Sequence, residues 1–155
     1  MEFLWLKWLH ILSATVLFGT GFGTAFYKWS ADRSGDVRAI AVVMRKVVLA
    51  DWIFTTTTIV IQPLTGLWMA FLAGYPLARG WVAWSLALYV FAGLCWLPVI
   101  WLQLRMRDMA LRAAATESAL PERYHRYSRI WFRLGIPAFA ALLAVYYLMV
   151  FRPAG

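Results

Sequence analysis

The sequence has little of what soluble or disulfide-bonded proteins rely on. Its single cysteine, Cys95, cannot form an internal disulfide and lies in an apolar run, where a thiol behaves as a small hydrophobe. Charged residues make up only 14% of the chain, and acidic residues number 7. Hydrophobic residues make up 63%, against roughly 45–50% in a soluble domain. This excess of apolar surface indicates that lipid is the solvent.

The usual catalytic and nucleic-acid-binding patterns are also missing. The chain has no Cys-x-x-Cys pair, no His-Glu-x-x-His motif, no phosphate-binding loop, no paired carboxylates and no Ser-His-Asp set. A net charge of +8 is typical of nucleic-acid-binding proteins, but here the cations lie in short stretches between apolar runs. Because no aromatic stacking platform accompanies them, we expect no nucleic-acid partner.

What the chain does have is four long apolar runs, at residues 3–27, 47–73, 81–104 and 130–151. Each supplies the roughly 20 residues that cross a hydrocarbon core of about 30 Å, and none shows the period-two alternation of a strand. The first run exceeds a signal-peptide core and no Ala-x-Ala-type site follows it. The sequence therefore predicts an all-α fold, a single integral membrane domain over 1–155 built as a four-transmembrane-helix bundle.

Lysine and arginine are unevenly divided between the two ends of these spans. Twelve of the 15 lie on one side: Lys28, Arg33, Arg38, Arg45, Lys46, Arg105, Arg107, Arg112, Arg123, Arg126, Arg129 and Arg133. The other side has Lys7, Arg79 and Arg152. The positive-inside rule then predicts basic loops in the cytoplasm and both the N- and C-termini outside (periplasmic), in a bacterial inner membrane.

The segments between the spans carry further expectations. The link 74–80 is short enough to make spans two and three an antiparallel hairpin. The stretch 105–117 is expected to extend span three as a helix along the anionic inner leaflet, ending before Pro121.

Span two carries a polar face. Its members follow helical spacing and are Asp51, Thr55, Thr58, Gln62, Thr65 and Met69. Such a face is either a polar interface that holds the bundle together or the wall of a site or conduit. Pro63 frees the carbonyl of Ile59, which threonine hydroxyls or the Gln62 amide are expected to satisfy. Asp51 is expected to pair with the basic residues 45–46.

Span one contributes His10 and Ser13, and its Gly19 and Gly23 form a GxxxG pair that predicts close helix packing. A histidine in a span is either a hydrogen-bonded packing residue or a ligand for haem iron or a metal. His125 lies at the opposite side, so a haem ligated by two histidines is not supported. Met69 lies about 6 Å from the outer end of span two, near the level of His10. The candidate cofactor-binding residues are His10, Met69, Gln62, Thr65 and Ser13.

Two resemblances bear on these residues. The opening 3–12 (FLWLKWLHIL) resembles the first helix of the HemJ-type protoporphyrinogen oxidases, and copper-resistance D-type membrane proteins begin in a related way. The first likeness implies haem b at His10; Ser85 stands where those oxidases carry a lysine, so it implies haem binding rather than porphyrinogen oxidation. Over nearly its whole length, through residues 49–52, 62–68 and 96–107, the chain resembles a bacterial family of predicted integral membrane proteins with a domain of unknown function.

The leading hypothesis is a small inner-membrane protein that binds haem b or a porphyrin through His10, for electron transfer or porphyrin handling. If it is an enzyme, we expect a haem-linked membrane oxidoreductase in which the cofactor performs the chemistry. The expected partners are the lipid bilayer and a porphyrin or quinone, with a homo-oligomer as a further expectation. The alternatives are a small-solute or copper transporter that uses the polar face of span two, and a cofactor-free structural or assembly protein.

Overall fold

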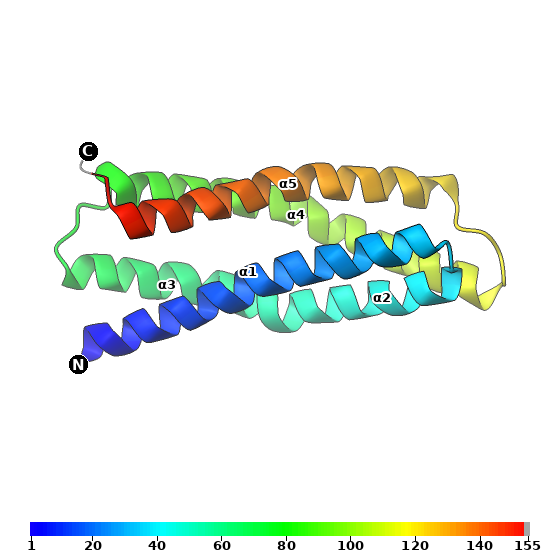
Figure 1. Cartoon of the computed structure of the whole chain (residues 1–155), viewed down its shortest axis with the longest axis horizontal. Helices are drawn as coiled ribbons and strands as arrows, with labels where there is room; N and C mark the ends of the chain where they lie inside the picture. Colours follow the sequence, from blue (N-terminus) through cyan, green and yellow to red (C-terminus); the bar gives the residue numbers. More distant parts are fainter. Residues whose placement is uncertain (154–155) are drawn as a thin grey trace.

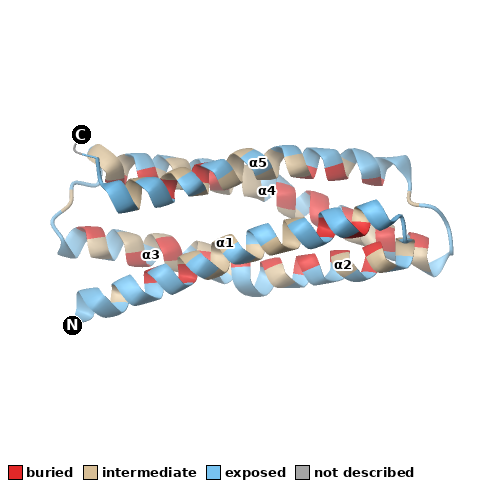
Figure 2. Ribbon diagram, in the orientation of Figure 1, coloured by how far each residue is buried: buried red, intermediate tan, exposed pale blue. Residues whose placement is uncertain are grey.

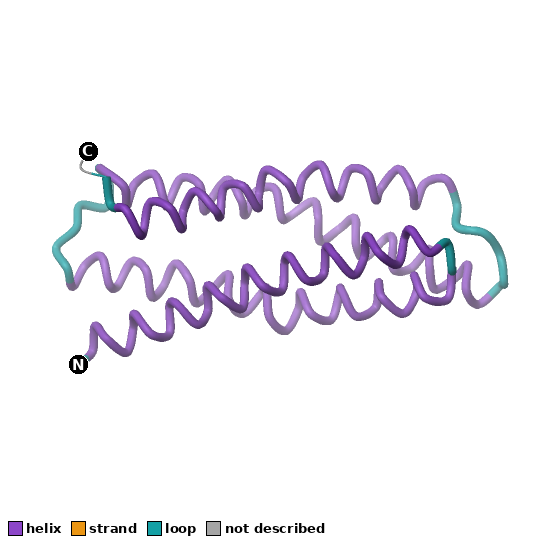
Figure 3. Tube along the Cα trace, viewed as in Figure 1, coloured by secondary structure: helices purple, strands orange, loops and turns teal. Residues whose placement is uncertain are grey.

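The computed structural model describes residues 1–153, and the predicted domain 1–155 extends beyond this range by residues 154–155. The chain forms α1 (Glu2–Ser34), α2 (Val37–Ala50), the π-helical turn η1 (Asp51–Thr55), α3 (Thr56–Leu72), α4 (Gly80–Ala115) and α5 (Glu122–Phe151) (Figure 1). No loop separates α2, η1 and α3 (Figure 3), so these elements form one rod beside α1, α4 and α5. The predicted all-α fold with four helices is confirmed over the described residues.

Helices α1, α4 and α5 are each long and apolar enough to cross a membrane. The predicted span 47–73 falls on the composite rod, where it begins in the last turn of α2 and ends just after α3. Helix α4 has 36 residues, which at 1.5 Å per residue is about 54 Å. Because a hydrocarbon core is only about 30 Å thick, the bundle is longer than the lipid it crosses.

The segments expected as basic loops are mostly helical, which corrects the sequence prediction. Helix α1 runs on to Ser34, and Gly35 then turns the chain with a φ of 68°, a left-handed conformation that favours glycine. Asp36 caps α2 by accepting hydrogen bonds from the backbone N–H groups of Arg38 (2.8 Å) and Ala39 (3.2 Å). At the second segment only residues 116–121 separate α4 from α5.

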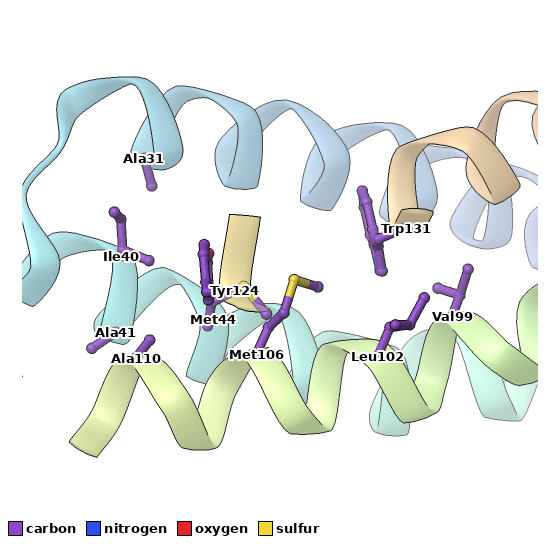
Figure 4. Close-up of a cluster of buried hydrophobic side chains, with 10 residues drawn as sticks. All are labelled: Ala31, Ile40, Ala41, Met44, Val99, Leu102, Met106, Ala110, Tyr124 and Trp131. Carbon is purple, nitrogen blue, oxygen red and sulfur yellow. The ribbon is translucent and has the colours of Figure 1, made fainter. Parts of the chain in front are cut away.

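These helical extensions form the best-packed part of the molecule, which we call the basic half (residues 28–55 and 99–133). Its core combines side chains from α1, α2, α4 and α5, which converge between the helices in Figure 4: Ala31, Ile40, Ala41, Met44, Val99, Leu102, Met106, Ala110, Tyr124 and Trp131. The expected helical extension of span three, ending before Pro121, is confirmed, since α4 runs on to Ala115. One face of this extension packs inside the bundle, because Met106 and Ala110 have no exposed surface.

We call the remainder the terminal half (2–27, 56–98 and 134–153). There α1 packs mainly on α3 and α4 on α5, and Phe18 of α1 stacks on Phe139 of α5 with ring centroids 4.4 Å apart. The start of α1 and the end of α5 lie at this end of the bundle (Figure 1). Spans two and three are joined by a short link and run antiparallel, as expected. They do not pack mainly on each other, because α3 packs on α1 and α4 packs on α5. The GxxxG prediction is wrong, since a Cβ added at Gly19 or Gly23 would meet no described atom within 4 Å. Buried residues are sparser in this half than in the basic half (Figure 2).

Candidate functional site

His10 is held between α1 and α3 by a directional hydrogen bond. Its Nδ1 lies 2.7 Å from the Thr65 hydroxyl oxygen, and that hydroxyl donates to the carbonyl of Ile61 at 2.8 Å. The Thr65 hydroxyl oxygen also lies 3.3 Å from the Gln62 carbonyl, and which of Thr65 and His10 donates in their shared bond depends on the imidazole tautomer. The bond engages Nδ1 in either case, and Nε2 has no hydrogen-bond partner among the described side chains.

Two further contacts fix the ring and the backbone around it. The Gln62 side-chain amide donates to the carbonyl of His10 at 2.9 Å. A Cβ placed on Gly66 would approach His10 Cε1 to 3.2 Å, so the absence of a side chain there lets the imidazole lie flat against α3. The glycine that matters for packing α1 is therefore Gly66, which the sequence spacing within span one could not indicate.

A cavity of about 480 Å³ opens between the rods of the terminal half, with His10 in its wall. Gln62 and Met69 from α3 also line it, together with Tyr89 from α4 and Tyr146 from α5. Most of the lining is aliphatic or aromatic, and its size falls within the roughly 300–1,000 Å³ of small-molecule sites. Such a chamber accommodates a large apolar ligand with few polar groups.

The structure brings together four of the five candidate residues. His10, Gln62 and Thr65 are in contact, and Met69 lines the same cavity as His10. Ser13 is buried, and its hydroxyl has no hydrogen-bond partner among the described residues. Over those residues no group of three or more His, Cys, Asp or Glu side chains could hold a metal ion alone. A bare metal site is thus not supported by the arrangement.

Tyr89 is a residue of this region that the sequence did not point to. Its hydroxyl donates to the Ile59 carbonyl at 2.6 Å, the group freed by Pro63 one turn later. The expectation that a threonine or the Gln62 amide would satisfy this carbonyl is wrong, because those side chains bond elsewhere. Only the unpaired carbonyl could be expected from the sequence; the donor comes from another rod.

The end of the polar face nearest α2 belongs to a separate network in the basic half. Asp51 accepts hydrogen bonds from Thr55 (2.8 Å) and from the side-chain amide of Gln103. Gln103 in turn accepts from the Trp131 indole N–H at 3.2 Å. The expected ion pair of Asp51 with residues 45–46 is wrong, since the described salt bridges do not include it. Burial on η1 directs this carboxylate inward, away from those cations.

A second network surrounds Lys28, which the sequence placed in a loop. Its ammonium is fully buried and donates to Asp32 (2.6 Å) and to the Ser128 hydroxyl (2.7 Å). Tyr124 also donates to Asp32 at 2.6 Å. The ammonium lies 5.2–5.5 Å from three ring centroids on α5, a cation–π distance. From the sequence, only the i, i+4 spacing of Lys28 and Asp32 could have indicated this ion pair.

The helices, their length and their outward-facing apolar side chains define a multi-pass integral membrane protein. Exposed residues such as Leu64, Phe71 and Ile136 (62–79%) need lipid around them. The chain belongs to the family described as predicted integral membrane protein (DUF2269), which it matches over residues 4–153. No curated protein and no solved structure matches the chain. The family-level resemblance seen in the sequence is confirmed, and the lipid bilayer is the partner that follows from it.

Proposed function

We propose that this membrane protein binds haem b, or a related porphyrin, in the cavity of the terminal half, with His10 as the iron ligand. The observation that carries the proposal is the orientation of one imidazole. Its Nδ1 is hydrogen-bonded to Thr65 at 2.7 Å, and His10 lies in the wall of a largely apolar chamber. The proposal assigns the ring proton to Nδ1, which would leave the lone pair of Nε2 for iron. The class of function is electron transfer or porphyrin handling.

The surroundings of His10 fit this role. A histidine that binds a metal usually donates its other N–H to a neighbouring oxygen, which sets the tautomer and the ring plane. Thr65 supplies that oxygen, Gln62 anchors the backbone of His10, and Gly66 leaves room for the ring. Iron held by a single proximal histidine is common in haem proteins, and a methionine is a frequent second ligand. Met69 of α3 and Met149 of α5 both line the cavity, so either methionine could supply that second position.

When bound, haem would supply one-electron chemistry, and the protein would supply the environment. The apolar lining of the cavity lowers the local dielectric and keeps water away from the ring. With its proton on Nδ1 directed at Thr65, the His10 ring would keep Nε2 unprotonated for iron. If catalysis occurs, these residues orient and insulate the cofactor rather than react themselves.

The polar contacts of α3 bear on the transport alternative. A conduit along the face from Asp51 to Met69 needs side chains that are free to contact a solute. Asp51 accepts hydrogen bonds from Thr55 and from Gln103, whereas Gln62 and Thr65 bond His10. These contacts favour a packing role for the part of the face at Asp51 and Thr55. They favour a role in positioning His10 for the part at Gln62 and Thr65.

Absorption spectroscopy of the purified protein tests the proposal. Protein from haem-replete cells, or apoprotein mixed with haemin in detergent, should show a ligated Soret band that His10→Ala abolishes. His125→Ala is the matched control and should retain the band, because His125 lies in the basic half. Imidazole added to His10→Gly should restore the band if the missing ligand is the cause. A colourless wild-type protein that takes up no haemin would remove the proposal.

A further inference from the structure

Two cations near the start of α1 and the end of α5 line the largely apolar cavity. Lys7 lies on α1 three residues before His10, which places both on the same face of the helix. Arg152 is the first residue after α5 and also lines the cavity. Both helix ends lie at the same end of the bundle (Figure 1). A cavity that served only neutral apolar molecules would have no use for this pair.

Arg152 is positioned rather than left free in solvent. Its Nη1 donates to the Tyr75 hydroxyl at 3.3 Å, and its guanidinium lies 5.9 Å from the ring centroid of Trp81. Tyr75 and Trp81 are cavity residues as well. An arginine has five N–H donors, so most remain available after the bond to Tyr75. The side chain is therefore held at the rim with donors to spare.

Among residues 1–153, neither cation has a carboxylate within salt-bridge range. The salt bridges of the described residues join Lys28 with Asp32, Arg38 with Glu117 and Arg107 with Asp108, and none includes Lys7 or Arg152. The rim thus carries two positive charges without a carboxylate partner in salt-bridge range. An anionic group on a ligand would complete it, since charge-assisted bonds to carboxylates are the strong ones.

We infer that Lys7 and Arg152 bind the carboxylates of the ligand, so that the cavity selects a tetrapyrrole with two free acid groups over an esterified porphyrin or a neutral quinone. The inference rests on the proposed function, because it assumes that a porphyrin occupies the cavity. It adds the orientation of the ligand: the acid edge lies at the terminal end, and the apolar edge lies toward the middle of the bundle.

The test uses metal-free protoporphyrin IX and its dimethyl ester, titrated into the full-length protein in neutral detergent, with tryptophan fluorescence quenching as the readout. The double variant Lys7→Gln/Arg152→Gln removes both rim charges. Arg79→Gln is the matched control, because this exposed arginine lies in the 73–79 segment at the same end and does not line the cavity. Circular dichroism and size-exclusion profiles of all proteins check that each is folded.

The wild-type and Arg79→Gln proteins should bind the diacid more tightly than the diester. The double variant should weaken diacid binding about tenfold or more, the loss expected when a charge-assisted bond is removed, and leave diester binding unchanged. Equal affinity of the wild-type protein for diacid and diester would overturn the inference, as would a double variant that binds the diacid like Arg79→Gln.

The experiment also separates this inference from the proposed function. Metal-free porphyrin takes no axial ligand, so His10→Ala should leave its affinity near the wild-type value while abolishing the haem Soret band. A rim that discriminates diacid from diester in a protein whose haem spectrum ignores His10 would refute iron ligation alone. A His10-dependent Soret band without rim discrimination would refute the rim assignment alone.

Discussion

The two halves of the bundle differ in how far their buried polar groups are paired by hydrogen bonds. In the basic half, Lys28 and Asp51 are both buried, and each finds partners on other rods. In the terminal half, the buried Ser13 hydroxyl has no partner among the described residues, and His10 lies in the wall of a cavity. Buried polar groups are nearly always paired in native proteins. The contrast is consistent with the proposal that the terminal half binds a ligand.

Packing follows the same division. Met106 and Ala110 have no exposed surface where four rods meet, whereas the rods of the terminal half enclose a cavity of about 480 Å³ and touch across it only locally, as at Phe18 and Phe139. A close-packed region keeps the rods in register, and a hollow region can adapt to a bound molecule. We infer that the basic half is the rigid base on which the cavity is built.

The buried ion pair should give the largest effect on stability. Asp32→Ala leaves the Lys28 ammonium inside the bundle without its carboxylate, which should cost about 3–5 kcal/mol. Unfolding by denaturant in mixed micelles measures the change. Glu117→Ala is the matched control, because it breaks the exposed pair with Arg38 (both side chains 75% exposed), worth about 0–1 kcal/mol. Similar losses in the two variants would refute the claim that the basic half depends on buried charges.

The same enlargement in the two halves should have unequal consequences. Ala110→Leu adds volume where no space exists and should destabilise the protein by about 1–3 kcal/mol. Ala14→Leu adds the same volume into the cavity, so it should leave the midpoint of thermal unfolding nearly unchanged and weaken porphyrin binding. Equal destabilisation by both substitutions would show that the terminal half is not hollow.

The smallest effect concerns the one bond that ties α4 to α3 beside the cavity. Tyr89→Phe removes the donor to the Ile59 carbonyl, and bonds of this kind in membrane bundles average about 0.6 kcal/mol. Unfolding in mixed micelles should register that loss, whereas Tyr147→Phe, at an exposed position (58%), should register none. A loss several times larger would mean that Tyr89, rather than the basic half, holds the rods together.

Much of the architecture could be predicted from the sequence, because it depends on local pattern. Runs of apolar residues long enough to cross lipid predicted the rods, and helical spacing predicted that Gln62 and Thr65 share one face, as they do on α3. The prediction of long basic loops was wrong, because it depended on charge rather than on apolar pattern. Arginines near a span favour one side of a membrane, but they do not prevent a helix, and the apolar residues among them continue the bundle.

The partners of individual polar groups could not be predicted in the same way. Pro63 indicated a free carbonyl at Ile59, yet its donor, Tyr89, lies 30 residues away on another rod. Asp51 pairs with Gln103 across 52 residues of the chain, and Lys28 pairs with Ser128 across 100. Local spacing does not determine which two helix faces meet, so these pairings could not be predicted from the sequence pattern.

By itself the sequence determined the solvent, the number of rods and the polar face of α3, since each depends on the hydrophobicity and spacing of residues near one another in the chain. Only the tertiary structure decided that the rods pack tightly at the basic end and separate at the other, that Thr65 orients His10, and that Lys7 and Arg152 share one rim. These features depend on the volumes and directions of side chains brought together from distant segments. Long-range packing, which local periodicity does not encode, therefore creates the cavity and its charge.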